Sequence, residues 1–159
     1  MMKFTENRKL HILDIENLLG DPRPSQVCVV DAMEHYMNLA NYGESDLLVA
    51  ACNHGAALEV GYALGGHHRL LLGSGPDGAD HALLNVLEGE GLSARFSRVV
   101  IGSGDGIFAE PAARLSRFGT QVTVVSRTVA LSARLNLAAA EVIYFDPATD
   151  IESALGVAA

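Results

Sequence analysis

The sequence predicts an α/β fold, a three-layer α/β/α domain with a mostly parallel sheet of five to six strands. Short apolar runs alternate with longer stretches in which apolar residues recur every three or four positions. The short runs lack the period-two alternation of a half-buried strand, as expected for parallel strands that helices cover on both faces. Six runs are therefore predicted to be strands: residues 10–14, 47–52, 69–73, 98–102, 121–126 and 141–145.

Five stretches between these runs are predicted to be helices. The first begins at Pro24 and Ser25, because proline fits the first turn of a helix, and ends before Gly43. Val30, Met33 and Tyr36 are expected on its buried face. A single domain over residues 1–159 is predicted, with its core at about 9–146 and a tail at 147–159 that forms a short helix or a frayed end. The predicted helices span residues 24–40, 55–64, 79–90, 108–118 and 129–137.

Acidic residues follow three of the predicted strands. Right-handed crossovers favour the strand order 3-2-1-4-5, which makes the first and fourth strands neighbours. Asp14 ends the first strand and Asp105 follows the fourth, so we expect them to meet at the carboxyl edge of the sheet. Asp77 and Asp80 follow the third strand and approach from the flank. Carboxylates gathered in this way indicate a site for a divalent cation.

Each of these aspartates also has a structural explanation. Asp14 fits a residue that caps the turn after a strand. Asp77 and Asp80 precede a helix and fit its N-cap and first turn. For Asp105 the functional interpretation is favoured, because the three glycines at 102, 104 and 106 allow unusual backbone conformations and a turn alone seldom needs so many.

The stretch from Gly73 to Gly78 offers a rival interpretation. It matches GxGxxG after a strand and before a helix, the pattern of a dinucleotide site. However, it follows the third strand instead of the first, and Pro76 removes an N–H that would face a pyrophosphate. No acidic residue ends the next strand. A nucleotide-binding regulator is therefore kept as a third possibility.

The composition limits the possible partners and location. A formal net charge of −8 excludes general binding of nucleic acid through phosphate neutralisation, so any contact with RNA must be local. Apolar runs are far shorter than the ~18 residues that a membrane span needs, and no signal peptide is evident, so a cytoplasmic protein is expected. Cys28 and Cys52 lie in apolar segments without zinc spacing, and both are predicted to be buried thiols.

Three motifs resemble the NYN domain family of PIN-like nucleases. They are Asp-Ile-Glu-Asn from Asp14, Gly-Ala-Asp ending at Asp80, and Ser-Gly-Asp-Gly-Ile-Phe from Ser103, and they occur in the family's order and spacing. The resemblance covers about residues 9–145. It implies a PIN-like fold and cleavage of RNA with Mg²⁺ or Mn²⁺. Carried over by position, it makes Asp14, Asp80 and Asp105 the metal-binding, catalytic carboxylates, with Asn17 as an accessory polar group.

One residue departs from the family pattern. Ile107 stands where family members often have a second acidic residue in the last motif, which puts a second metal ion or catalysis in doubt. Asp77 is placed to compensate as a further metal ligand. Two hypotheses follow. The first is a metal-dependent ribonuclease, and the second is a catalytically weak or inactive PIN-like module that binds RNA or a protein.

Polar residues after the second and fifth strands are expected at the same edge of the sheet, where they can reach phosphates or bases. His54 is either such a contact or a helix cap, and residues 67–68 are expected at the opposite edge. The RNA is expected to be single-stranded, with local contacts only. The small size and high apolar content are compatible with a homodimer. The predicted substrate contacts are Asn17, Asn53, Ser103 and Arg127.

Overall fold

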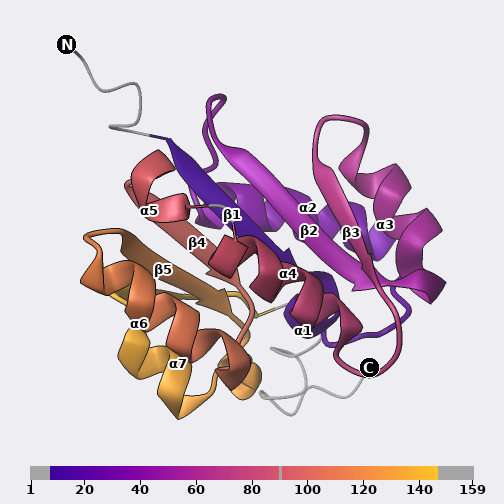
Figure 1. Cartoon of the computed structure of the whole chain (residues 1–159). Coiled ribbons are helices and arrows are strands. Elements are labelled where there is room, and N and C mark those ends of the chain that lie inside the picture. The colour runs from indigo at the N-terminus through magenta and orange to yellow at the C-terminus, as the bar shows by residue number, and fades with distance from the viewer. Residues whose placement is uncertain (1–7, 90, 147–159) are drawn as a thin grey trace.

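A six-stranded, all-parallel sheet forms the middle layer of the protein (Figure 1). The structure is a computed structural model that describes residues 8–89 and 91–146. The strand order is β3-β2-β1-β4-β5-β6, which confirms the predicted fold class and order and adds β6 beyond β5. The strands are β1 (Lys9–Asp14), β2 (Leu47–Asn53), β3 (Arg69–Gly73), β4 (Arg98–Gly102), β5 (Gln121–Ser126) and β6 (Glu141–Tyr144).

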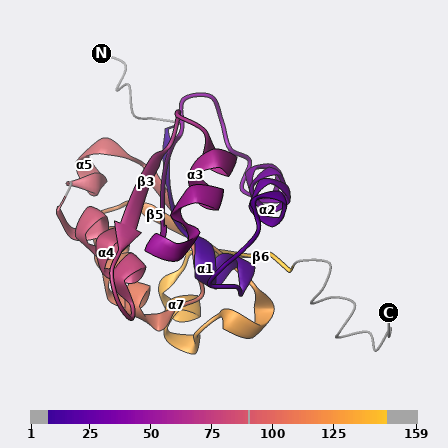
Figure 2. The same cartoon turned by 90° about the vertical axis from the view of Figure 1, so that its right-hand side faces the viewer.

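Helices cover both faces of the sheet, which Figure 2 shows close to edge-on. None of the described helices is long and apolar enough to cross a membrane. Short 3₁₀ segments follow three strands: η1 (His54–Ala56), η2 (Gly106–Phe108) and η3 (Thr128–Ala130). One face carries α4 (Gly78–Gly89), α5 (Leu92–Arg95), α6 (Ala109–Arg117) and α7 (Ala133–Ala138). The other face carries α1 (Ile15–Leu19), α2 (Gln26–Leu39) and α3 (Ala57–Leu64).

Alternate residues of each strand enter two separate hydrophobic cores. In β1, Leu10 and Ile12 pack with α4 and α6, whereas Leu13 packs with α1 and α2. All three side chains are buried. Because both faces of the strand are covered, neither face needs polar residues, which explains why the strands read as unbroken apolar runs.

The first long helix differs from the prediction in its buried face. Ser25 caps α2, and Val29, Met33 and Tyr36 are buried, while Val30 is 42% exposed. Cys28 is also exposed, so the prediction of a buried thiol was wrong there and right for Cys52. An apolar run on a helix turns about 100° per residue, so its members cannot all face the core.

Two short helices, α1 and α5, were not predicted. Helix α1 begins directly after Asp14 and ends at Gly20, whose φ of +71° is the left-handed conformation that glycine adopts without strain. Five residues give too weak a periodic signal to be recognised in the sequence. Helix α4 runs to Gly89. The predicted end at Glu90 and the predicted tail at 147–159 lie outside the described residues.

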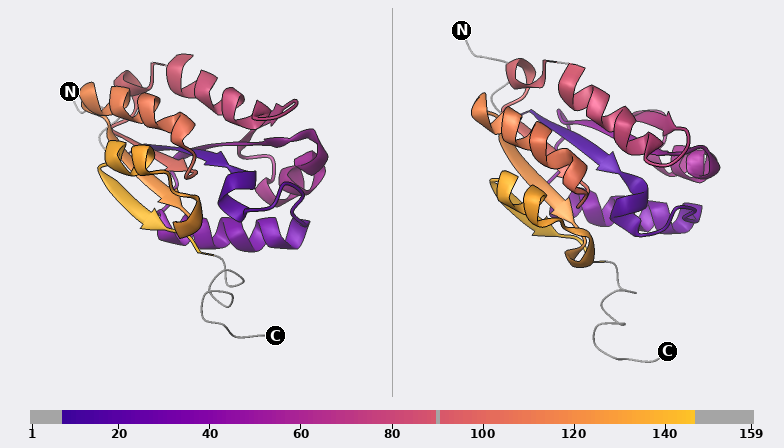
Figure 3. Two further views of the ribbon diagram at one scale, coloured as in Figure 1. Left: turned by 90° about the horizontal axis from the view of Figure 1, so that it is seen from below. Right: turned by 60° about the horizontal axis from the view of Figure 1, so that its bottom comes forward.

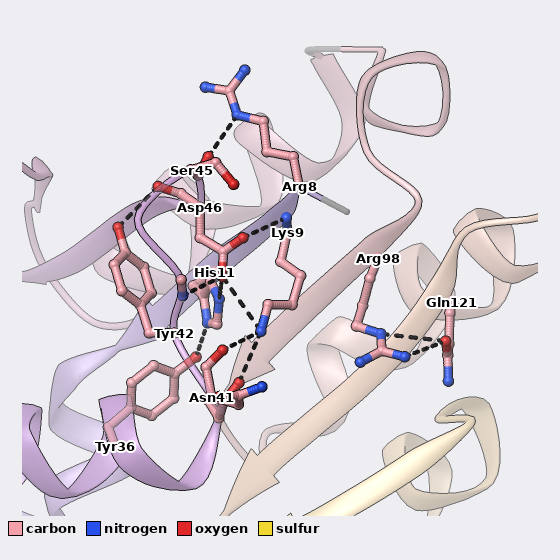
Figure 4. Close-up of polar contacts among 12 residues, drawn as sticks. Arg8, Lys9, His11, Tyr36, Asn41, Tyr42, Ser45, Asp46, Arg98 and Gln121 are labelled. Atoms are coloured by element: carbon pink, nitrogen blue, oxygen red, sulfur yellow. Dashed lines mark hydrogen bonds and ion pairs between the residues drawn. The ribbon is translucent and has the colours of Figure 1, made fainter. Parts of the chain in front are cut away.

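A buried polar cluster lies at the amino edge of the sheet (Figure 4). His11 Nδ1 is 2.7 Å from the Tyr36 hydroxyl, and its Nε2 is 3.4 Å from Asp46 Oδ2. Burial lowers the pKa of His11 to about 4, so the ring is neutral at pH 7. Asp46 also accepts hydrogen bonds from the backbone N–H groups of Lys9 and Gly43. These contacts fasten the loop before β2 to β1.

Gly73 and Gly78 lie against each other where β3 ends and α4 begins. A Cβ on Gly73 would stand 2.0 Å from the carbonyl carbon of Gly78. Because backbone cannot yield as a flexible side chain does, Gly73→Ala is expected to lower the free energy of unfolding by about 3 kcal/mol. Gly66→Ala, which has open space around the added Cβ, should change it by less than about 0.5 kcal/mol. Urea unfolding measures both, and equal stability of the two variants would contradict the close packing.

Candidate functional site

A cleft of about 290 Å³ opens at the carboxyl edge of the sheet, beside α1. Figure 3 shows this side of the molecule, with α1 between the two helix layers. Asp14, Asp77, Asp80 and Asp105 all line the cleft, so the structure brings together the four predicted metal ligands. They meet because β1 pairs with β4 and because α4 begins close to the end of β3.

Asp14 is held in place from two sides. Its Oδ1 accepts a hydrogen bond from the Asn17 N–H at 3.3 Å, as the N-cap of α1, and its Oδ2 accepts one from the Ser103 hydroxyl at 3.2 Å. The residue is only 4% exposed. The capping role considered for Asp14 is therefore present, and it fixes the carboxylate at the floor of the cleft.

Asp14 and Asp80 are buried carboxyl groups that interact with each other. Burial, followed by the hydrogen-bonding effect and the charge of Asp80, raises the pKa of Asp14 to about 8. Burial also raises the pKa of Asp80, with further contributions from the charges of Asp105, Asp77 and Glu16. Without a cation, the pair therefore holds one proton at neutral pH.

Asp105 lies at the partly exposed side of the cleft. Its Oδ1 accepts a hydrogen bond from the Ile107 N–H at 2.9 Å, and its own N–H donates to Ser103 Oγ at 3.2 Å. The Ser103 hydroxyl thus links Asp14 to Asp105. This link joins the ends of β1 and β4, and it holds the Asp14 carboxylate and the Asp105 backbone, while the Ile107 N–H holds the Asp105 carboxylate.

The glycines around Asp105 serve close packing. None of the three at 102, 104 and 106 has a positive φ, so the expectation that they permit unusual backbone conformations was wrong. A Cβ on Gly104 would stand 2.4 Å from the Ala130 carbonyl oxygen and from Ser126 Oγ. A side chain at this position would therefore push the Asp105 loop away from the segment that follows β5.

Two predicted substrate residues, Asn17 and Asn53, line the cleft, but their side chains also make internal contacts. Asn17 Oδ1 accepts the Gly104 N–H at 2.9 Å. Asn53 Oδ1 accepts the Ala56 N–H, and its Nδ2 donates to the Pro22 carbonyl. Both asparagines hold loops in place, so a direct contact with substrate stays a prediction.

Ser103 and Arg127 do not line the cleft. Ser103 is fully buried beneath Asp14. Arg127 Nε donates to the Asn17 carbonyl at 3.0 Å, which ties the end of β5 to α1. His54, also considered as a contact, lies 2.9 Å from Ser74 Oγ through its Nε2. These contacts indicate that Ser103 and Arg127 hold the site in place, and they do not favour the predicted contact of either residue with RNA.

Glu16 and Asp21 also line the cleft, and the sequence reasoning gave neither a role. Glu16 Oε1 accepts the Asn53 N–H at 2.7 Å, so it links α1 to the end of β2. The feature of the sequence that could have indicated a role for Glu16 was its place in the Asp-Ile-Glu-Asn motif, two residues after Asp14. Among the described residues that line the cleft, none is basic, and the six acidic ones are Asp14, Glu16, Asp21, Asp77, Asp80 and Asp105.

The donor set fits a hard divalent cation by its chemistry. Mg²⁺ and Mn²⁺ prefer oxygen ligands, and the cleft presents several carboxylates. Among the described residues that line the cleft, no basic side chain offsets their negative charge. Within residues 8–89 and 91–146, no three His, Cys, Asp or Glu side chains stand close enough to hold a metal ion as they are placed. Some of these side chains would therefore have to move closer together to bind a cation, and binding would also displace the proton that Asp14 and Asp80 share.

The comparisons with known proteins address the fold. No protein-family model and no curated protein matches the chain. A crystal structure of a protein of unknown function, VPA0982 from Vibrio parahaemolyticus RIMD 2210633, is similar, with 18% sequence identity and a TM-score of 0.57. The similarity covers 92% of this chain and 97% of the other. At this identity it supports the three-layer α/β/α fold alone.

Proposed function

We propose that the acidic cleft binds Mg²⁺ or Mn²⁺ and that the protein is a metal-dependent ribonuclease acting on single-stranded RNA. One observation carries the proposal: a buried carboxyl pair, Asp14 and Asp80, shares a cleft with Asp105 and with no basic side chain among its lining residues. Such an arrangement is costly without a cation, because buried like charges repel each other. The resemblance of the three motifs to the NYN domain family supports RNA as the substrate.

Each carboxylate has a distinct part in this proposal. Asp14, held by Ser103 and Asn17, and Asp105, held by the Ile107 N–H, would bind the cation together with Asp80. A bound cation supplies an activated water and neutralises charge on the phosphate. Asp77 is exposed at the rim, where it is available as a further ligand. Because the carboxyl pair holds a proton, cation binding should release it.

Ile107 favours a second candidate function. Its side chain is partly buried and packs against the core formed with α4 and α6. The position where the family often has a second acid therefore contributes no carboxylate. The alternative is a catalytically weak or inactive module that binds RNA or a protein at the same edge. The cytoplasmic location and the homodimer that we expect from the sequence are compatible with both candidate functions.

Mn²⁺ binding tests the site directly. Titration calorimetry should show saturable Mn²⁺ binding to the wild-type protein, weakened more than about tenfold in Asp105→Asn, since even residues behind a metal ligand typically contribute 10- to 100-fold. Asp31→Asn makes the same chemical change on the exposed side of α2 and should leave binding unchanged. Absence of saturable binding by the wild-type protein would contradict the proposal.

A cleavage assay then separates the two candidate functions. A labelled single-stranded RNA is incubated with the protein in Mn²⁺ and, as a control, in EDTA. Cleavage that requires Mn²⁺ and is lost in Asp105→Asn supports the ribonuclease. Saturable Mn²⁺ binding without cleavage supports the inactive module, because the site would then exist without the activity.

A further inference from the structure

We infer that a polar rim beside the acidic cleft, made of Arg23, His54 and Ser74, binds the phosphate of the RNA chain next to the one that is cut. This inference rests on the proposed function, because the cleft is taken as the place of cleavage. A cation bound in the cleft neutralises one phosphate, but the acidic lining repels the phosphates on either side of it. A neighbouring phosphate therefore needs donors outside the cleft.

A hydrogen bond between two lining residues joins the rim to the cleft. Pro22 and Asn53 both line the cleft, and Asn53 Nδ2 donates to the Pro22 carbonyl at 2.8 Å. Arg23 directly follows Pro22, and His54 directly follows Asn53. The bond therefore holds the backbone of Arg23 and that of His54 at the same side of the cleft.

The Arg23 side chain lies over the turn that carries His54. Its Nε is 3.8 Å from the position that a Cβ on Gly55 would take. The backbone N–H of Arg23 donates to Asp21 Oδ1 at 2.8 Å, which holds the turn before it. The side chain is exposed, and no described residue forms an ion pair with its guanidinium. An exposed guanidinium offers parallel N–H donors that match the oxygens of a phosphate.

Ser74 brings a hydroxyl to the rim from the end of β3. It directly follows that strand and precedes Gly75, which lines the cleft. Its Oγ is 2.9 Å from His54 Nε2, and both side chains are exposed. A serine hydroxyl has one donor and two acceptor sites, so it can accept the imidazole N–H and donate its own proton to a phosphate oxygen. The pair thus presents a donor on the same side of the cleft as Arg23.

The contact between Ser74 and His54 also resembles a nucleophile beside its base, but the geometry favours phosphate binding. A catalytic base is oriented by a third group, and among the described residues His54 has no hydrogen-bond partner besides Ser74. Phosphate binding needs only exposed donors. Contacts of this kind position a nucleic acid without reading its sequence. We therefore expect the rim to place the RNA chain on the cation without selecting a base.

The test compares two double variants that remove the same side-chain types from opposite edges of the sheet. Arg23→Ala/His54→Ala removes two members of the rim. Arg117→Ala/His67→Ala removes an exposed arginine at the end of α6 and an exposed histidine before β3, both at the amino edge. Binding of a fluorescent ten-nucleotide oligouridylate is measured by anisotropy in EDTA, which prevents metal-dependent cleavage. Circular dichroism confirms that both variants are folded.

Loss of one phosphate contact should weaken binding by the rim variant about fivefold at 0.1 M salt and lower the salt slope by about 0.7, the contribution of each single-strand contact. The amino-edge variant should bind as the wild type does. Arg23→Ala alone keeps the backbone bond to Asp21 and should show the same change in slope, so it decides the matter if the double variant does not fold. Unchanged affinity in the rim variant, equal loss in both variants, or no binding by the wild type overturns the inference.

Catalysis gives an independent readout. In Mn²⁺, the rim variant should raise the KM for RNA about fivefold with kcat unchanged, because it loses binding that the ground state and the transition state share. Hydrolysis of bis(p-nitrophenyl) phosphate, which has no neighbouring phosphate, should match that of the wild type. Equal loss on both substrates overturns the inference, because the rim would then act on the cation site itself. If the wild-type protein cleaves neither substrate, the proposed function fails, and the anisotropy measurement decides whether the rim binds RNA.

Discussion

Asp14→Asn is expected to lower the rate of Mn²⁺-dependent RNA cleavage at least about 100-fold while the protein stays folded. Residues behind a metal ligand contribute 10- to 100-fold to affinity or activity, so loss of a ligand should cost at least as much. Folding should survive because the asparagine oxygen can still accept the hydrogen bond from the Asn17 N–H. Because the metal-free pair already holds one proton at neutral pH, the neutral amide resembles the protonated carboxyl group of Asp14. The measurement is kcat on a labelled single-stranded RNA.

Asp21→Asn provides the matched control for this prediction. Asp21 lines the same cleft but is exposed, and its Oδ1 accepts the Arg23 N–H, a bond that asparagine can replace. Its removal changes the charge of the cleft by the same amount without touching the buried pair. A rate close to that of the wild type is expected. Equal losses in the two variants would show that overall charge, and not the Asp14 carboxylate, governs cleavage.

The stability of the metal-free protein should fall as the pH rises from 6.5 to 8. Asp14 has a pKa of about 8 in the folded protein and 3.8 as its ordinary value, so the folded state binds the proton more tightly than the unfolded state. Its contribution is complete below pH 3.8 and is lost as the pH rises towards 8. For one proton, the free energy of unfolding should decrease by about 2 kcal/mol across this window.

Between pH 6.5 and 8, the effect of Asp14 on stability can be distinguished from that of His11. The pKa of His11 is lowered from 6.5 to about 4, so its contribution is present above pH 6.5 and is lost as the pH falls towards 4. Below pH 6.5 the two groups therefore act in opposite directions. Urea unfolding in EDTA at pH 6.5 and 8 should show the decrease for the wild type and a much smaller one for Asp14→Asn. Added Mn²⁺ should restore stability at pH 8, and a flat wild-type profile in EDTA would contradict the shared proton.

The strand pattern predicted the fold because its physical cause is local. Parallel strands buried on both faces must be apolar throughout, and their spacing leaves room for one crossover helix. The convergence of Asp14, Asp80 and Asp105 followed from the same pattern, because the strand order makes β1 and β4 neighbours. The exposure of Cys28 did not follow, because an apolar run on a helix does not reveal which of its members faces the core.

The contacts that support the site depend on residues far apart in the chain. Ser103 lies 89 residues from Asp14, and Arg127 lies 110 residues from Asn17. A residue at the end of a strand is expected near the carboxyl edge, but the sequence does not show whether its side chain faces the cleft or a neighbouring loop. Ser103 and Arg127 contact such loops instead of lining the cleft, and only the packed structure distinguishes the two outcomes.

The central position of β1 has a consequence for synthesis on the ribosome. β1 is made first, yet in the finished sheet it lies between β2 and β4. A nascent chain that has reached only α4 carries Asp14 and Asp80 but lacks the strand that brings Ser103 and Asp105 beside them. The acidic cleft can therefore be completed only after β4 has been made, and a prematurely released fragment that ends before β4 cannot form it.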